Sequence, residues 1–237
     1  MSTESDVEVV ELLPHLHMLR FMVGQAYVWR DGASLTLIDA GPVGAGPGIA
    51  RALRELGHGP EDVDRVVVTH FHEDHTGSLA EVAAWAGAVV VAHRADAPFV
   101  RGELAGPAPD FADWERELRA TIPVTPPSPP ARVDHEVDDG DVLDFGGGAQ
   151  VVAVPGHTDG SIALYLPEPR VLFTGDTAAN PGGQTMLGVF NLDRERTAAS
   201  FLRLAGLDAE IACFGHGDPI LSGASAALRA AATRLGS

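Results

Sequence analysis

The chain has no lysine and only one cysteine among its 237 residues. A single cysteine, Cys213, excludes a disulfide framework within the chain. Its apolar neighbours predict a packed thiol in a buried strand. All positive charge comes from arginine, and 16 basic residues against 33 acidic ones leave a formal net charge of −17. A field of this sign repels phosphate backbones and anionic lipid, so we expect neither nucleic acid nor a membrane as partner.

No apolar run is long enough to span a bilayer. Residues 1–6 lack the basic and apolar segments of a secretory signal. We therefore expect a cytoplasmic protein. The sequence does not indicate an oligomeric state.

The apolar pattern predicts strands and helices in an irregular order. A hairpin at Asp31-Gly32 separates the first two expected strands. A strand-rich block, a helix, a second strand-rich block and further helices favour two packed sheets with helices outside. The expected strands are 21–29, 35–39, 64–69, 88–92, a short one between 141 and 146, 150–154, 162–166, 171–174 and 211–214. The expected helices are 49–56, 78–86, 113–120, 194–205 and 224–235, with Gly57 as the stop of the first and Asp193 as the N-cap of the fourth.

Proline is concentrated in one stretch, at about residues 95–133. Strands resume after it, so we interpret it as an insertion within a single domain spanning 1–237. Phe99, Phe111 and Trp114 lie in this insertion. They either roof an apolar pocket or pack locally around a short helix.

The most informative motif is Thr69-His70-Phe71-His72-Glu73-Asp74-His75. Imidazole and carboxylate groups are the usual protein ligands of zinc, iron and manganese. Four such side chains converge only if the chain turns sharply between a strand and a helix. We expect His70 and His72 to bind one metal ion, and Asp74 and His75 a second.

Three more residues of ligand type each follow an apolar strand and a glycine: His157, Asp176 and His216. Strand ends gather functional groups at the edge of a sheet. We expect His157 to join His70 and His72, and His216 to join the second ion. A carboxylate has two oxygens, so Asp176 is expected to bridge both ions.

These motifs resemble the metallo-β-lactamase superfamily. The family pattern H-x-H-x-D-H matches His70 to His75, and its later motifs match Pro155-Gly156-His157-Thr158-Asp159-Gly160-Ser161, Thr174-Gly175-Asp176 and Gly215-His216-Gly217. The resemblance covers about residues 20–235. It implies an αβ/βα sandwich, two mixed β-sheets packed face to face with helices outside. It also implies that Asp39 supports the metal loop by orienting a ligand histidine.

Many β-lactamase members have cysteine where Asp176 stands, so the resemblance favours the glyoxalase II, lactonase and RNase Z branches. We expect a hydrolase that holds two divalent ions, zinc first and iron or manganese as alternatives. It would cleave an ester, thioester or lactone of a small molecule through a metal-bridging hydroxide, with Asp74 accepting the proton.

Other interpretations stay open. Persulfide dioxygenases of similar fold bind one iron through residues matching His70, His157 and Asp176, which would make the protein an oxidoreductase. A β-lactamase, an RNase Z-like nuclease and a non-catalytic binding protein are lesser alternatives, and the acidic composition argues against the nuclease. We expect no metal ligand among the histidines at positions 15, 17, 58, 93 and 135.

Overall fold

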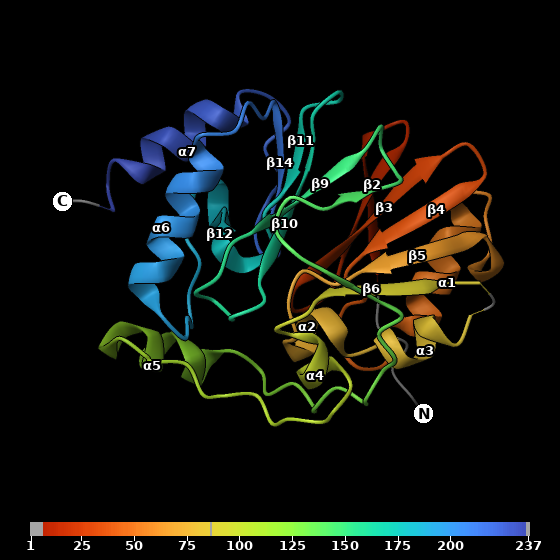
Figure 1. Cartoon of the computed structure of the whole chain (residues 1–237), viewed down its shortest axis with the longest axis horizontal. Helices are drawn as coiled ribbons and strands as arrows, with labels where there is room; N and C mark the ends of the chain where they lie inside the picture. Colours follow the sequence, from red (N-terminus) through yellow and green to blue (C-terminus); the bar gives the residue numbers. More distant parts are fainter. Residues whose placement is uncertain (1–6, 86, 236–237) are drawn as a thin grey trace. The chain divides into compact units, whose positions relative to one another are not determined.

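A computed structural model describes residues 7–85 and 87–235 (Figure 1), so the predicted signal-free start at 1–6 lies outside the described residues. The chain divides into two compact units. The first contains the chain up to Ala105 together with Thr125–Val137, and the second contains Gly106–Val124 and the chain from Asp138 onward. Whether the chain folds as one domain stays a prediction. Within the described ranges, no helix combines the length and apolar character needed to cross a bilayer.

The first unit is built on a seven-stranded sheet whose strands follow one another in chain order. The first four strands pair antiparallel and the remaining three pair parallel, so the sheet is mixed. The predicted hairpin is confirmed, with Asp31 opposite Ser34 and Gly32 at φ 63°. The strands are β1 (Glu8–Leu13), β2 (Leu16–Arg20), β3 (Gln25–Asp31), β4 (Ser34–Ile38), β5 (Val63–Val67), β6 (Val89–His93) and β7 (His135–Val137).

Short helices follow the strands of this unit. Helix α1 ends where Gly57 adopts φ 84°, as the sequence predicts. Ile49 and Leu53 of α1 and Leu79 of α3 are buried in one core with apolar side chains of the sheet. The predicted helix 78–86 ends earlier, at Ala83, and its expected last residue, Ala86, lies outside the described ranges. The helical segments are α1 (Gly46–Glu55), η1 (Pro60–Asp62), α2 (Glu73–Thr76), α3 (Leu79–Ala83) and α4 (Ala97–Val100).

The second unit has a five-stranded sheet in the order β14-β11-β10-β9-β8, with β11 and β14 as its parallel pair. Helices α6 and α7 lie side by side (Figure 1) and bury Phe201, Leu204 and Leu228 with the apolar side chains of this sheet. Asp193 caps α6 as predicted, accepting a hydrogen bond from the Arg196 amide at 2.9 Å. The elements are α5 (Asp113–Thr121), β8 (Val142–Leu143), β9 (Ala149–Ala153), β10 (Ile162–Leu166), β11 (Val171–Phe173), η2 (Gly175–Thr177), β12 (Ala178–Ala179), η3 (Pro181–Gly183), β13 (Met186–Leu187), α6 (Arg194–Ala205), β14 (Ile211–Cys213) and α7 (Ala224–Ala232).

Five strands, β1, β2, β7, β12 and β13, were not predicted. The sequences of β1, β2 and β7 mix charged and apolar residues, and β7, β12 and β13 have only two or three residues each. Such segments become strands because a neighbouring strand supplies hydrogen-bond partners, which is a tertiary effect. The insertion is divided between the two units, since its helix α5 belongs to the second unit and its two flanking arms to the first.

Candidate metal centre

In the first unit, the chain changes from strand to helix directly at the ligand motif. Strand β5 ends at Val67, and His72 is the extended residue before α2 begins at Glu73. This turn brings together the potential ligand atoms of three residue pairs, His70–His72, His70–His75 and Asp74–His75, each within 4.8 Å. His70 and His75 are buried, whereas His72 and Asp74 are partly exposed. The sharp turn expected from the sequence is therefore present.

Gly77 ends this short helix without adopting a left-handed conformation. It has ordinary helical dihedral angles, and an added Cβ would lie 2.2 Å from the Val43 amide nitrogen. The position thus requires glycine for close backbone packing.

Asp39 organises the base of the motif. It is a buried non-glycine residue at φ 65°. Its Oδ1 accepts the Thr69 amide at 2.7 Å, and its Oδ2 accepts the Thr69 hydroxyl at 2.8 Å. The same Oδ2 lies 2.8 Å from His75 Nδ1. Asp39 therefore contacts both the strand end and a candidate ligand.

These contacts assign the histidine tautomers. The Thr69 hydroxyl gives its only proton to Asp39, so its oxygen accepts from His70 Nδ1, which is 3.0 Å away. His75 Nδ1 likewise donates to the carboxylate of Asp39. In both neutral rings the lone pair is then on Nε2, the state a metal ligand requires. Sequence reasoning missed Thr69, whose place beside His70 was the available signal.

Residues of the insertion also contact this motif. Asp96 is buried and accepts the Phe71 amide, between two candidate ligands, at 3.0 Å. The Phe99 ring stacks on Phe71 with 4.6 Å between centroids. Sequence reasoning considered Phe99 but missed Asp96, because the two contacting segments are separated by a whole strand.

In the second unit, three strand ends deliver His157, Asp176 and His216. Strands β11 and β14 are parallel neighbours with Phe173 opposite Cys213, so Asp176 and His216 leave the sheet at the same edge. Asp176 Oδ2 lies 3.7 Å from His157 Nε2 and 3.1 Å from His216 Nε2. The sheet register therefore gathers these three predicted residues.

His157 is held from its other ring nitrogen. Asn191 Oδ1 lies 3.3 Å from His157 Nδ1, while Asn191 Nδ2 donates to the Gly188 carbonyl at 2.8 Å. The amide oxygen therefore faces the ring, and the lone pair of neutral His157 is on Nε2, toward Asp176. Gly156 precedes it at φ 132°, and a Cβ there would lie 2.3 Å from the Thr197 amide nitrogen. Asn191 gave no signal in the sequence.

The donor atoms fit divalent metal ions. Two ligands about 2.0–2.1 Å from one tetrahedral ion lie about 3.3 Å apart. The Nε2-to-carboxylate distances of 3.6 Å for His75–Asp74, 3.7 Å for His157–Asp176 and 3.1 Å for His216–Asp176 are near that value. Each unit therefore contains a cluster that can bind part of a metal centre.

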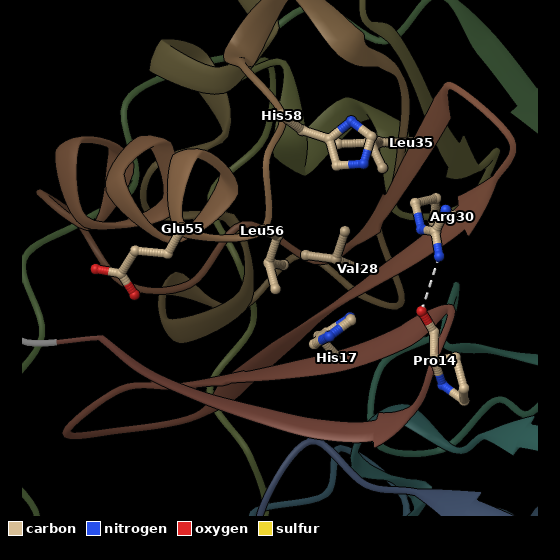
Figure 2. A pocket seen from close by; sticks show the side chains of 8 residues that line it. All are labelled: Pro14, His17, Val28, Arg30, Leu35, Glu55, Leu56 and His58. Atoms are coloured by element: carbon tan, nitrogen blue, oxygen red, sulfur yellow. Dashed lines mark hydrogen bonds between the residues drawn. The ribbon is translucent and has the colours of Figure 1, made fainter.

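The other histidines lie elsewhere in the first unit. His17 and His58 line a cavity of about 440 Å³ near the end of α1, where the Arg30 guanidinium donates to the Pro14 carbonyl (Figure 2). Burial lowers the pKa of His17 from its ordinary value. His93 Nδ1 accepts a hydrogen bond from the Ala95 amide at 3.2 Å, and His135 is exposed. None of the predicted ligands lines this cavity.

Phe111, just before α5, and Trp114, in its first turn, pack locally. The Phe111 ring meets Phe190 edge-on at 5.6 Å, and Arg194 lies over the half-exposed ring of Trp114. Local packing, the second of the two alternatives for the insertion, is thus observed for these two residues.

The comparisons with known proteins agree with this description. The family model for the metallo-beta-lactamase superfamily matches residues 19–216. A Bacillus subtilis (strain 168) protein named "Probable metallo-hydrolase YflN" is 31% identical, with 86% of this chain and 84% of that protein covered. The hydroxyacylglutathione hydrolase of Rhodobacter capsulatus is 31% identical over 81% of this chain. The chain spans 61% of the length of that enzyme.

Among solved structures, a metallo-beta-lactamase family protein from Thermus thermophilus has a TM-score of 0.67 and 28% identity. The match covers 95% of this chain and 79% of that one. The chain therefore belongs to the metallo-beta-lactamase superfamily, whose members bind divalent metals, and the predicted fold class is confirmed. Within that class it is a metal-dependent hydrolase.

Proposed function

We propose that the protein hydrolyses a thioester of a small molecule with two metal ions held jointly by the two clusters. His70, His72 and His157 would bind one ion, and Asp74, His75 and His216 the other, with Asp176 bridging them. The observation that carries the proposal is the tautomer control in each unit, where Asp39, Thr69 and Asn191 direct Nε2 lone pairs away from the protein frame. A purely structural histidine cluster has no need of this arrangement.

The donor set favours zinc, since it combines imidazole with carboxylate. Iron and manganese accept the same ligands, so metal identity is part of the proposal. Bound ions of this kind act as Lewis acids toward a carbonyl group and lower the pKa of water.

The residues of the chain supply the remaining functions. Asp74 is partly exposed, with its Oδ2 3.6 Å from His75 Nε2, so its carboxylate is accessible for accepting a proton. Asp39 keeps His75 oriented through its Nδ1. Asp176 is largely buried, and its Oδ2 lies near the Nε2 atoms of both His157 and His216, so that all three side chains could contact the metal ions.

The choice of a thioester rests on the hydroxyacylglutathione hydrolase among the relatives. Esters and lactones follow the same carbonyl chemistry and are the next candidates. The net charge of −17 supports a small-molecule substrate over nucleic acid. We also propose a cytoplasmic location, consistent with a single, buried cysteine.

Elemental analysis of the purified protein, followed by a substrate panel, tests the proposal. We expect about two zinc ions per chain and faster turnover of a hydroxyacylglutathione thioester than of lactone, phosphodiester or β-lactam substrates. One iron per chain with consumption of oxygen would instead identify a dioxygenase. Metal-free protein that hydrolyses the thioester at full rate would refute the metal-dependent mechanism.

A further inference from the structure

The insertion helix α5 carries a buried carboxylate for which the proposed chemistry has no use. Glu115 is 1% exposed, although most of α5 faces solvent. Its Oε2 accepts the Ala112 amide at 2.9 Å and so closes the first turn of the helix. Its Oε1 accepts the Phe190 amide at 3.2 Å, with Arg194 Nη1 3.5 Å away. One carboxylate thus joins the insertion to a distant loop.

The loop at this contact is strained. Phe190 has φ 59°, a left-handed conformation that bulky residues rarely adopt. Such strain persists only where the surroundings hold the residue in place. Three contacts from the insertion do so: the Glu115 hydrogen bond, the edge of the Phe111 ring at 5.6 Å, and the Asp110 amide donating to the Asn191 carbonyl at 3.1 Å.

The same loop is hydrogen-bonded to His157 and to the residue before it. Asn191 Oδ1 faces His157 Nδ1 at 3.3 Å, and the Leu192 amide donates to the His157 carbonyl at 3.3 Å. The Asp193 amide donates to the Gly156 carbonyl at 2.9 Å. The loop therefore fixes both the backbone and the imidazole ring of His157.

We propose that Glu115 is a positioning residue, through which the insertion fixes the orientation of His157. It holds Phe190 and Asn191 so that the Asn191 amide keeps His157 with its lone pair on Nε2. The consequence for metal binding rests on the proposed function, in which His157 is a ligand. The consequence for the His157 tautomer does not.

The test compares Glu115→Ala and Glu115→Gln with Glu117→Gln, a matched control on the exposed side of the same helix. Two measurements are made on each protein: zinc affinity by competition with a chelator, and the ¹⁵N shifts of the His157 ring in metal-free protein. We expect Glu115→Ala to weaken zinc binding about tenfold and to mix the ring tautomers. Glu115→Gln, which keeps one acceptor oxygen, should lie between Ala and the parent. The control should match the parent in both measurements.

Unchanged zinc affinity and an unchanged His157 tautomer in folded Glu115→Ala would overturn the proposal. If that variant fails to fold, Asn191→Ala tests the same connection one step nearer to His157. An unaltered ring tautomer there would also overturn it. Absence of zinc binding by the parent protein would count against the proposed function alone, because the tautomer measurement needs no metal.

Discussion

The two clusters of candidate ligands are assembled in different ways. The first lies within one short stretch, from His70 to His75, and a single strand-to-helix turn brings its side chains together. The second joins residues from three strand ends, and the pairing of β11 with β14 brings Asp176 and His216 to one edge. The first cluster depends on local geometry, whereas the second depends on the register of a whole sheet.

The groups that orient the two clusters also differ. A buried carboxylate, Asp39, accepts a hydrogen bond from His75 Nδ1 and is linked to His70 through the Thr69 hydroxyl. A neutral amide, Asn191, serves His157 over a longer distance of 3.3 Å. Hydrogen bonds to a charged acceptor contribute about 1.5–3 kcal/mol and those to a neutral one about 1 kcal/mol. The first cluster is therefore expected to be the more rigid.

Removing a candidate ligand from the local cluster should have the largest effect. His72→Ala should lose metal and reduce kcat/KM by about 10³-fold, since Lewis-acid stabilisation amounts to several kcal/mol. The fold should be retained, because the His72 side chain makes no capping hydrogen bond to α2. Metal content and turnover are measured together. Glu73→Gln, one residue further along the motif, is the control and should keep activity within about twofold. Full activity in His72→Ala would exclude His72 as a metal ligand.

Removing the orienting side chain of each cluster tests whether the two clusters differ in rigidity. Asp39→Ala should destabilise the fold by about 4.5 kcal/mol or more, because it removes the charged acceptor of three buried hydrogen bonds. Asn191→Ala should cost about 2 kcal/mol by the same reasoning, because it removes two hydrogen bonds between neutral groups. Urea denaturation of both variants measures the difference. Equal losses would show that the two clusters are held equally firmly.

The smallest effect is expected at Cys213, which ends the strand that leads to His216. Burial raises the pKa of this thiol, so the folded state keeps the proton that the unfolded state releases above about pH 8.5. The contribution of the thiol to the free energy of unfolding is thus complete below that pH. Above it, this contribution falls by up to about 1.4 kcal/mol per pH unit. Cys213→Ala should lack this slope between about pH 8.5 and 10 in urea denaturation. It should leave turnover at neutral pH unchanged, and an altered rate would give the thiol a role in the site.

Much of the fold was predictable because its central strands are continuous apolar runs. The strand at 162–166 was predicted with its observed bounds, and the Asp193 cap of α6 followed from residue type alone. Strands β1, β2 and β7 were missed, since their mixed composition becomes strand only through pairing with neighbours. The insertion was recognised by its prolines, but its helix α5 was not expected to join the second unit.

The sequence by itself determined the chemistry of this protein. Ligand types, their order along the chain and the glycines around them can be read from consecutive residues, and they define the family. The tertiary structure alone decided which groups orient those ligands. Thr69, Asp96, Glu115 and Asn191 act through hydrogen bonds whose partners are set by packing, and a hydrogen bond between distant segments leaves no periodic mark in a sequence. Asp39 illustrates both contributions. The resemblance indicated its position in the sequence, and only the fold showed that one carboxylate orients two histidines, His75 directly and His70 through Thr69.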